Sequence, residues 1–218
     1  MKRVTVRRGK THVITGPMYS GKTSYVFEVL KTNLFGRKKV LMIKYSKDTR
    51  YNGNGKRNWA KSHDGFGMPA ILVESFIAGE DPIELLDNPD VIGIDEGQFM
   101  DGIADFCERC NSCGIDVYVA CLMTDYNLVH WPNTQSLTRR YGVYKQMYAV
   151  CIRCGDDEAT CSKRVDIEPT TSTMVASECI GGDELYISTC FPCHSLEVTE
   201  EMKKKRQEII QSIKTWHL

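Results

Sequence analysis

The sequence predicts an α/β fold, with a mainly parallel central sheet followed by a small cysteine-rich domain. Its short apolar runs are continuous rather than alternating, which is typical of strands that are buried on both faces. Stretches with helical periodicity separate several of these runs, as expected for parallel strands joined by crossover helices. After residue 150 the character changes to cysteine pairs, glycines and short β-prone pieces.

The predicted elements follow in chain order. The strands are Lys10–Thr15, Lys39–Tyr45, Val91–Asp95, Val117–Leu122 and Met147–Val150. A helix is expected after Lys22, and the Gly- and Asn-rich stretch 51–67 is predicted to be a surface loop. Near the end, a helical spacing predicts an amphipathic helix whose apolar stripe contains Met202, Ile209, Ile210, Ile213 and Trp216. The expected division is therefore a main domain over 1–150, a small domain over 151–196 and a terminal helix over 197–218.

Composition argues against several partners. Lys and Arg number 28 and Asp and Glu number 28, so no generally basic surface is expected and nucleic acid is not an expected partner. No apolar run reaches the roughly 18 residues of a membrane span, and the start lacks the apolar core of a signal peptide. We expect a cytoplasmic protein without a membrane partner, in which the 10 cysteines are metal ligands, core residues or reactive thiols.

One glycine-rich turn matches the phosphate-binding pattern G-x-x-x-x-G-K-[ST], the P-loop. Its residues are Gly16, Pro17, Met18, Tyr19, Ser20, Gly21, Lys22 and Thr23. A predicted strand precedes it and a predicted helix follows it, which is the context that the motif needs. Backbone N–H groups of this motif cradle phosphates, the lysine meets the β- and γ-phosphates, and the threonine ligates Mg²⁺. The sequence therefore predicts binding of a nucleoside triphosphate with Mg²⁺, and leaves the phosphate acceptor open.

Two carboxylates stand at the end of the predicted strand Val91–Asp95. Asp95 occupies the place where P-loop proteins carry the carboxylate associated with Mg²⁺. Glu96 could accept a proton from water, giving an ATPase, or from a substrate hydroxyl, giving a kinase. Helix capping or a solvated turn is the simpler interpretation of either carboxylate alone, but the upstream motif favours a functional one.

Two C-x-x-C pairs predict a metal site. They are formed by Cys151 with Cys154 and by Cys190 with Cys193, and four thiolates suit tetrahedral Zn²⁺ in a closed structural site. The 35 residues between the pairs exceed the spacing of the commonest zinc pattern, so they must form a loop or hairpin of their own. His194 is an alternative ligand, and four reduced cysteines without a metal are the simplest alternative.

A third group of cysteines is expected to belong to the core. Cys107, Cys110 and Cys113 have a spacing that could suggest an iron–sulfur cluster, but the expected continuation of that motif is absent. Ile103, Phe106, Cys107 and Cys110 also fit the buried stripe of a helix, and cysteines are common in protein cores.

Five motifs together resemble the type II, zinc-containing thymidine kinase family. They are the P-loop 16–23, Lys44-Tyr-Ser-Lys-Asp-Thr-Arg-Tyr51, Ile94-Asp-Glu-Gly-Gln-Phe99, the C-x-x-C pairs and Ile180-Gly-Gly182. Their order and approximate spacing agree, and the resemblance covers about residues 10–194. It implies a RecA-like P-loop domain, a small zinc-binding lid with a lasso loop, and a homotetramer in many members.

The resemblance also implies a reaction, the transfer of the γ-phosphate of ATP to the 5′-hydroxyl of thymidine, and of deoxyuridine, in nucleotide salvage. Glu96 is similar to the catalytic base of the family, and Lys22 and Arg50 to residues that neutralise phosphate charge. Thr23 and Asp95 would hold Mg²⁺, and Zn²⁺ would be structural. ATP and thymidine are the implied partners, with feedback binding of thymidine triphosphate.

The resemblance further implies a thymidine site and shows where this chain differs. The implied site contains Met18, Phe99, Leu122, Tyr126, Ile180, Gly181 and Tyr186, for which core packing is the alternative role. Arg164 resembles a basic position of the lid. Met123 stands where bacterial-like relatives carry an arginine, and Trp131 falls near a position where relatives carry a phenylalanine. The lasso segment 170–179 shares little with relatives.

Two other classes of function compete with a kinase. In a DNA-stimulated P-loop ATPase of RecA or helicase type, Glu96 would activate water, but the sequence lacks a basic stripe interleaved with aromatic residues. In a zinc-ribbon binding module, the nucleotide would be a structural or switching ligand and no nucleoside would be turned over. Among kinases, a broader pyrimidine-nucleoside kinase is the nearest alternative.

Overall fold

The computed structural model describes residues 7–48, 59–61, 67–77, 88–165 and 185–215. A six-stranded sheet in the order β5-β2-β6-β7-β1-β8 forms its centre, and every neighbouring pair of strands in it is parallel. The strands are β1 (Thr11–Thr15), β2 (Val40–Tyr45), β5 (Ile71–Val73), β6 (Val91–Asp95), β7 (Asp116–Cys121) and β8 (Lys145–Gln146). The predicted α/β class with a parallel sheet is confirmed.

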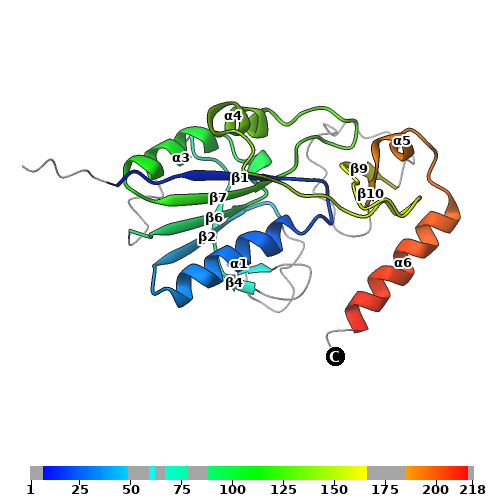
Figure 1. The fold of residues 1–218 in the computed structure, drawn as a ribbon, viewed down its shortest axis with the longest axis horizontal. Helices are drawn as coiled ribbons and strands as arrows, with labels where there is room; N and C mark the ends of the chain where they lie inside the picture. Colours follow the sequence, from blue (N-terminus) through cyan, green and yellow to red (C-terminus); the bar gives the residue numbers. More distant parts are fainter. Residues whose placement is uncertain (1–6, 49–58, 62–66, 78–87, 166–184, 216–218) are drawn as a thin grey trace, which may run out of the picture.

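Helices cover both faces of this sheet (Figure 1). One face carries α1 (Lys22–Phe35), and the other carries α3 (Ile103–Ser112) and α4 (Pro132–Tyr141). Under α1, Val26 and Leu30 pack on the sheet, where Gly93 of β6 leaves room for them. On the opposite face Phe106 of α3 lies fully buried. Burial on both faces explains why the strands are continuously apolar.

The carboxyl ends of the parallel strands meet at one edge of the sheet, which positions the candidate site. The turn 16–23 follows β1, Asp95 ends β6, and Leu122 follows β7. Lys44 of β2 is the register partner of Asp95. Loops at this edge of an open parallel sheet are the usual place for ligands in α/β proteins.

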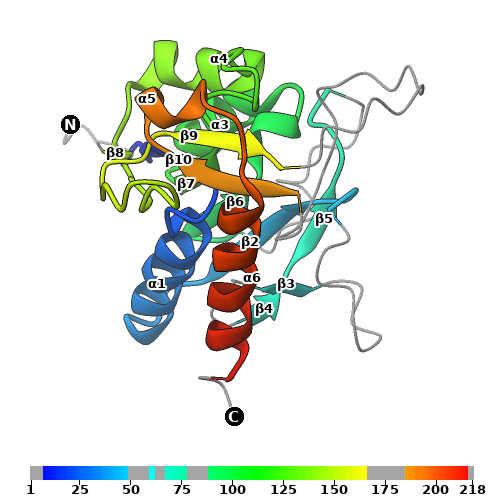
Figure 2. The same ribbon diagram turned by 90° about the vertical axis from the view of Figure 1, so that its right-hand side faces the viewer.

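A second, smaller group of elements, which we call the small domain, lies beyond that edge (Figures 1 and 2). It contains the antiparallel pair β9 (Cys161–Arg164) and β10 (Tyr186–Thr189), followed by α5 (Phe191–His194) and α6 (Glu200–Thr215). Met202 of α6 is buried against Val165 and Ile187, so the predicted stripe docks at its first turn. Further along the helix Ile209 is 45% exposed, and Trp216 lies outside the described residues.

Two expectations about strands were wrong. The last strand of the main sheet is Lys145–Gln146 rather than the predicted Met147–Val150, because the chain leaves the sheet after Met147 donates its N–H to the carbonyl oxygen of Thr15 at 2.7 Å. The predicted loop 51–67 contains strand β3 (Trp59–Lys61), which pairs with β4 (Gly67–Pro69). Strands of three residues are too short to show a period. In the described ranges, no helix has the length and apolar character of a bilayer span.

Candidate active site

The glycine-rich turn after β1 has the tight geometry that its sequence predicts; we refer to residues 16–23 as the phosphate loop. Gly21 has φ +80°, a left-handed conformation that favours glycine. A Cβ on Gly16 would lie 2.5 Å from the carbonyl oxygen of Met147, so no larger residue fits there without a shift. Tyr19 also has positive φ, 65°. The loop therefore follows a path that is costly without its two glycines.

Lys22 opens α1 and turns its ammonium back over the phosphate loop. Its Nζ donates to the carbonyl oxygen of Pro17 at 2.6 Å and lies 3.4 Å from Oγ of Ser20. Ser20 also donates to the same carbonyl, at 2.8 Å. A phosphate oxygen would be a stronger partner for the ammonium than this shared carbonyl, because it carries a negative charge and the carbonyl does not.

Thr23 and Asp95 meet between α1 and β6. The Thr23 hydroxyl donates to Oδ1 of Asp95 at 3.0 Å, and Asp95 is buried. Octahedral Mg²⁺ with oxygens at about 2.1 Å places neighbouring ligand atoms about 2.9 Å apart, so this pair has the spacing of two oxygens around one ion or its water shell. The donor set of hydroxyl and carboxylate oxygen also suits Mg²⁺.

A buried ion pair lies behind this carboxylate, and the sequence analysis did not identify it. Lys44 Nζ is 3.5 Å from Oδ2 of Asp48, and each residue is only 2% exposed. Lys44 is the register partner of Asp95 and Asp48 follows the end of β2, so the pair lies beside the strand that ends at Asp95. Both residues fall within the quoted motif 44–51, but neither had been singled out.

Glu96 is held by the short turn that follows β6. It has φ 58° and ψ 37°, a left-handed conformation that is uncommon for a residue other than glycine. Its Oε2 accepts a hydrogen bond from Nε2 of Gln98 at 2.6 Å. The buried Gln98 side chain in turn accepts the backbone N–H of Leu122 at 3.0 Å. Gln98 therefore joins the carboxylate to the end of β7, a role that its place in the motif alone did not reveal.

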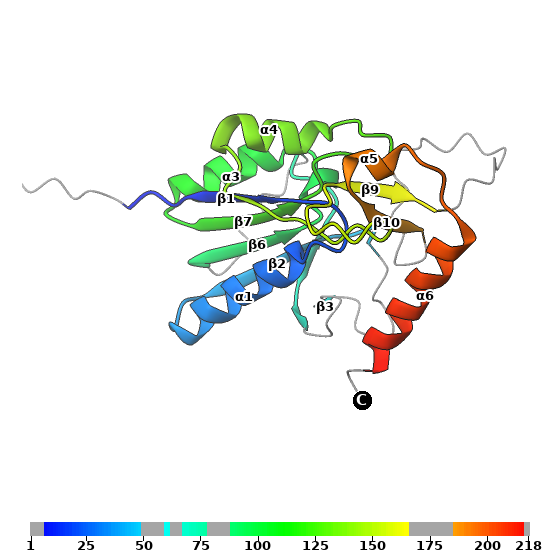
Figure 3. The same ribbon diagram turned by 45° about the vertical axis from the view of Figure 1, so that its right-hand side comes forward.

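The β9–β10 pair contacts the phosphate loop directly (Figure 3). The backbone N–H of Met18 donates to Oγ of Ser162 at 2.9 Å, and the Tyr19 hydroxyl donates to the carbonyl oxygen of Tyr186 at 3.0 Å. Two hydrogen bonds thus connect the loop after β1 with the small domain. Ser162 was another residue that sequence reasoning missed.

Aromatic side chains gather on both sides of this junction. Phe99 stacks on Tyr45 with ring centroids 5.2 Å apart and meets Trp131 edge-on at 5.1 Å. Tyr126, in the loop between β7 and α4, faces Tyr186 of β10 across the junction, with ring centroids 6.3 Å apart.

Of the implied thymidine residues, Met18 is thus in the phosphate loop, Phe99 and Leu122 are on the main domain, and Tyr126 and Tyr186 pair across the junction. Arg164 lies over the Tyr126 ring at 5.7 Å from its centroid. Arg50, Ile180 and Gly181 lie outside the described residues.

The four predicted cysteines come together although 35 residues separate the two pairs. The sulfur atoms of Cys151, Cys154, Cys190 and Cys193 all lie within 4.8 Å of one another. Zn–S bonds of about 2.3 Å in a tetrahedron place the sulfurs about 3.8 Å apart. The separation of 3.7 Å between the sulfurs of Cys154 and Cys190 matches that value. The residues therefore fit a structural zinc ion.

A neighbouring histidine lies outside this set of ligands. Burial raises the pKa of Cys151, but backbone N–H groups of Cys154, Cys190 and Arg153 lower it to about 6. Hydrogen bonds with the other cysteines raise the pKa of Cys154 and raise that of Cys193 to about 12, so the geometry rather than the pKa values supports the metal site. The Nε2 of His194 lies 3.1 Å from the carbonyl oxygen of Tyr126, and His194 is not part of the cysteine cluster. The alternative of His194 as a ligand is therefore disfavoured.

The cysteines of α3 fit the core interpretation in part. Cys107 and Cys110 are buried in the core, as predicted, whereas Cys113, just after the helix, is exposed. In the described ranges no second group of potential metal ligands is found. Burial raises the pKa of Cys121, at the end of β7, to about 12, so its thiol stays protonated near neutral pH.

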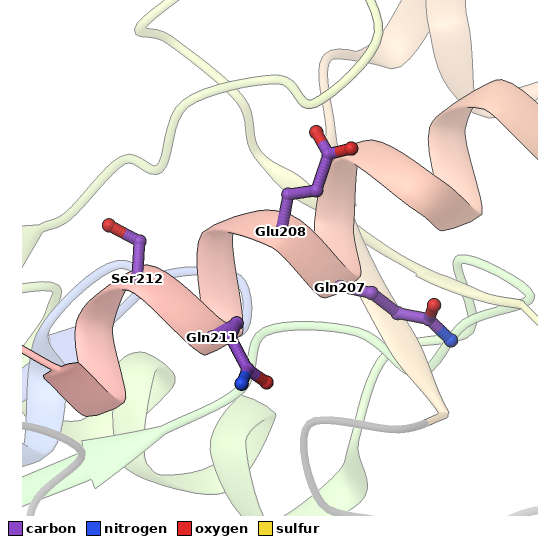
Figure 4. A pocket seen from close by; sticks show the side chains of 4 residues that line it. All are labelled: Gln207, Glu208, Gln211 and Ser212. Atoms are coloured by element: carbon purple, nitrogen blue, oxygen red, sulfur yellow. The ribbon is translucent and has the colours of Figure 1, made fainter.

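A hollow along α6 is unrelated to this site (Figure 4). It is lined by Gln207, Glu208, Gln211 and Ser212. All four are exposed residues of a single helix, so within the described part of the chain no second element supplies groups that could enclose a ligand there.

The fold and the site together define a nucleotide-binding α/β protein with a cysteine-cluster domain. The family model described as thymidine kinase matches residues 9–194. The chain is 37% identical over 197 residues to thymidine kinase 1 of Dictyostelium discoideum, covering 90% of this chain and 82% of that protein. It is 38% identical over 189 residues to the thymidine kinase of Yaba monkey tumor virus and 35% identical over 186 to that of Myxoma virus strain Lausanne. Those two matches cover 86% and 85% of this chain, and 96% of each viral protein. The chain belongs to the thymidine kinase family.

Proposed function

We propose that this protein transfers the γ-phosphate of ATP to the 5′-hydroxyl of thymidine, and of deoxyuridine, giving the monophosphate in nucleotide salvage. The observation that carries the proposal is the convergence of Lys22, the Thr23–Asp95 pair and Glu96 at one edge of the sheet. These groups can bind phosphate, hold a hard cation and accept a proton, which are the parts that phosphoryl transfer needs. The family match supports thymidine as the acceptor.

In this proposal each polar residue has one task. Glu96 accepts the proton of the thymidine 5′-hydroxyl, and its hydrogen bond from Gln98 fixes the carboxylate while leaving lone pairs for the substrate. Lys22 leaves the carbonyl of Pro17 to bind the β- and γ-phosphates. Arg50, proposed from the sequence motif, adds positive charge to the transferred group.

Two metal ions complete the proposal. Thr23 and Asp95 would hold Mg²⁺, which neutralises phosphate charge when bound with ATP. The four clustered cysteines would hold a structural Zn²⁺, which stabilises the folded small domain. The remainder of the phosphate loop, Gly16 to Gly21, would contribute backbone N–H groups to the phosphates.

Thymidine is proposed to bind between the phosphate loop and the small domain. Phe99 and Leu122 would line one side and Tyr126 and Tyr186 the other, with Met18 between them. Aromatic and aliphatic surfaces suit a flat pyrimidine. Ile180 and Gly181 are included on the strength of the sequence motif alone.

We also propose the wider organisation of the protein. The main domain would span 1–150, the zinc-binding lid 151–196 and the terminal helix 197–218, in a cytoplasmic homotetramer. Thymidine triphosphate would act as a feedback inhibitor, because its phosphates suit the phosphate loop and its base suits the adjacent aromatic residues. Such inhibition should weaken as thymidine concentration rises; inhibition independent of thymidine would contradict it.

The proposed function is tested by incubating the protein and Mg-ATP with separate acceptors. The panel is thymidine, deoxyuridine, deoxycytidine, deoxyadenosine, deoxyguanosine, single-stranded DNA and no acceptor, with ADP and nucleoside monophosphate both measured. Monophosphate formation that depends on thymidine is the expected result. ATP hydrolysis stimulated only by DNA would instead indicate a helicase-type ATPase, in which Glu96 activates water.

A further inference from the structure

A buried hydrogen-bond donor lies beside the proposed nucleoside site and has no acceptor in the described part of the chain. It is the indole Nε1 of Trp131, which has almost no solvent exposure. The indole N–H of a buried tryptophan usually has a partner, and leaving such a donor unpaired costs about 1–3 kcal/mol. An acceptor that arrives with a ligand would remove this cost.

The position of Trp131 indicates which ligand this is. Its ring meets Phe99 edge-on with centroids 5.1 Å apart, and Phe99 ends the turn that begins at Glu96. Its backbone N–H donates to the carbonyl oxygen of Met123 at 3.2 Å, closing the loop that also carries Tyr126. The indole is therefore held between two of the proposed walls of the nucleoside site.

A second buried hydrogen-bond donor, in the side chain of Arg164, lies near the same walls of the proposed site. The Nε of Arg164 is buried without an acceptor among the described residues, while its guanidinium lies over the Tyr126 ring. Two donors without acceptors, one from each side of the site, favour a ligand that carries oxygens as well as a flat apolar ring. A pyrimidine nucleoside has both.

We propose that the Trp131 indole N–H donates a hydrogen bond to an oxygen of the bound nucleoside, either a base carbonyl or the 3′-hydroxyl, and so contributes to its affinity and selection. This inference rests on the proposed function, because it takes a nucleoside as the ligand. Since the bond is made to a part of the nucleoside that does not react, its loss raises KM and leaves kcat nearly unchanged.

The test variant is Trp131→Phe, which keeps an aromatic ring beside Phe99 and removes only the donor. Loss of one net hydrogen bond predicts that kcat/KM for thymidine falls about 2- to 12-fold, through KM. Trp59→Phe makes the same chemical change in the β3–β4 hairpin and should leave kcat/KM unchanged.

Substrate analogues then identify the acceptor. 2-Thiothymidine, 4-thiothymidine and 3′-deoxythymidine each weaken or remove one candidate oxygen. For one of these analogues, the ratio of kcat/KM between the wild type and Trp131→Phe should fall to about 1. An equal loss for all three analogues, or no loss for thymidine itself, would overturn the proposal.

Calorimetric binding of thymidine without ATP separates this inference from the proposed function. If the wild type binds thymidine more tightly than Trp131→Phe but forms no monophosphate, the proposed function fails and the hydrogen bond stands. If the wild type forms monophosphate and both proteins bind thymidine equally, the hydrogen bond fails and the proposed function stands.

Discussion

Substitutions of Glu96 separate its chemistry from the conformation that holds it. Glu96→Gln preserves an acceptor for the Gln98 amide and the left-handed backbone, but cannot take up a proton. We therefore expect ATP binding to be nearly unchanged and kcat to fall by about 10²–10⁴, the usual contribution of a general base. The measurement is steady-state monophosphate formation, together with ATP affinity by calorimetry. Near-normal kcat in this variant would remove Glu96 from the mechanism.

The backbone of Glu96 predicts a second, independent result. A left-handed conformation costs a residue other than glycine about 1–2 kcal/mol, whereas glycine loses about 0.5–1 kcal/mol through its greater freedom in the unfolded chain. Glu96→Gly should thus be more stable than Glu96→Ala by about 0.5–1 kcal/mol, or roughly 1–4 °C in Tm for a chain of this size. Both variants should lose activity. An alanine variant as stable as the glycine variant would refute the argument from strain.

Three other perturbations have expected outcomes. Cys190→Ser should reduce the zinc content from about one ion per chain and lower Tm, because structural zinc contributes to folding; elemental analysis and a thermal melt check this. Lys44→Met removes the ion partner of the buried Asp48 carboxylate and should cost about 3–5 kcal/mol in chemical denaturation. Burial lowers the pKa of His12, so below about pH 6.5 the unfolded chain binds more protons at this residue than the folded chain does, and the free energy of unfolding should decrease as the pH falls. His12→Phe retains a ring against Tyr118 and should reduce this loss of stability.

The cysteine and lysine variants each have a matched control. Cys113→Ser changes an exposed cysteine and should leave the zinc content unchanged. Lys47→Met breaks an exposed pair with Glu74 and should cost no more than about 1 kcal/mol. Folded, active protein without zinc would contradict the first prediction. Equal losses of unfolding free energy in Lys44→Met and Lys47→Met would contradict the prediction for the buried ion pair. A pH dependence of stability that is the same in His12→Phe as in the wild type would contradict the prediction for His12.

The sequence predicted those parts of the fold that depend on local pattern. Four strands of the parallel sheet and helix α1 follow from continuous apolar runs and helical spacing, and the cysteine cluster follows from two short spacings. Strand β8 was misplaced because Met147–Val150 is as apolar as a strand, and only the connection to the small domain shows where pairing with β1 ends.

The missed residues of the site act through contacts between distant segments. Gln98 was quoted in the sequence analysis only as part of a motif and was given no role. Its hydrogen bond with the backbone N–H of Leu122 depends on how the turn after β6 meets the end of β7. The Lys44–Asp48 ion pair joins a strand to the turn after it. A spacing of four residues predicts a side-chain contact within a helix, but not between a strand and a turn. Ser162 reaches Met18 across 144 positions of sequence.

Thymidine-dependent formation of the monophosphate is the measurement that tests the central claim most directly. Wild type and Glu96→Gln are compared with Mg-ATP and thymidine, with the no-acceptor reaction as the baseline. The account predicts one monophosphate formed per ADP for the wild type, and a loss of about 10²–10⁴ in the variant. ADP release by the wild type that is the same with and without thymidine would contradict it.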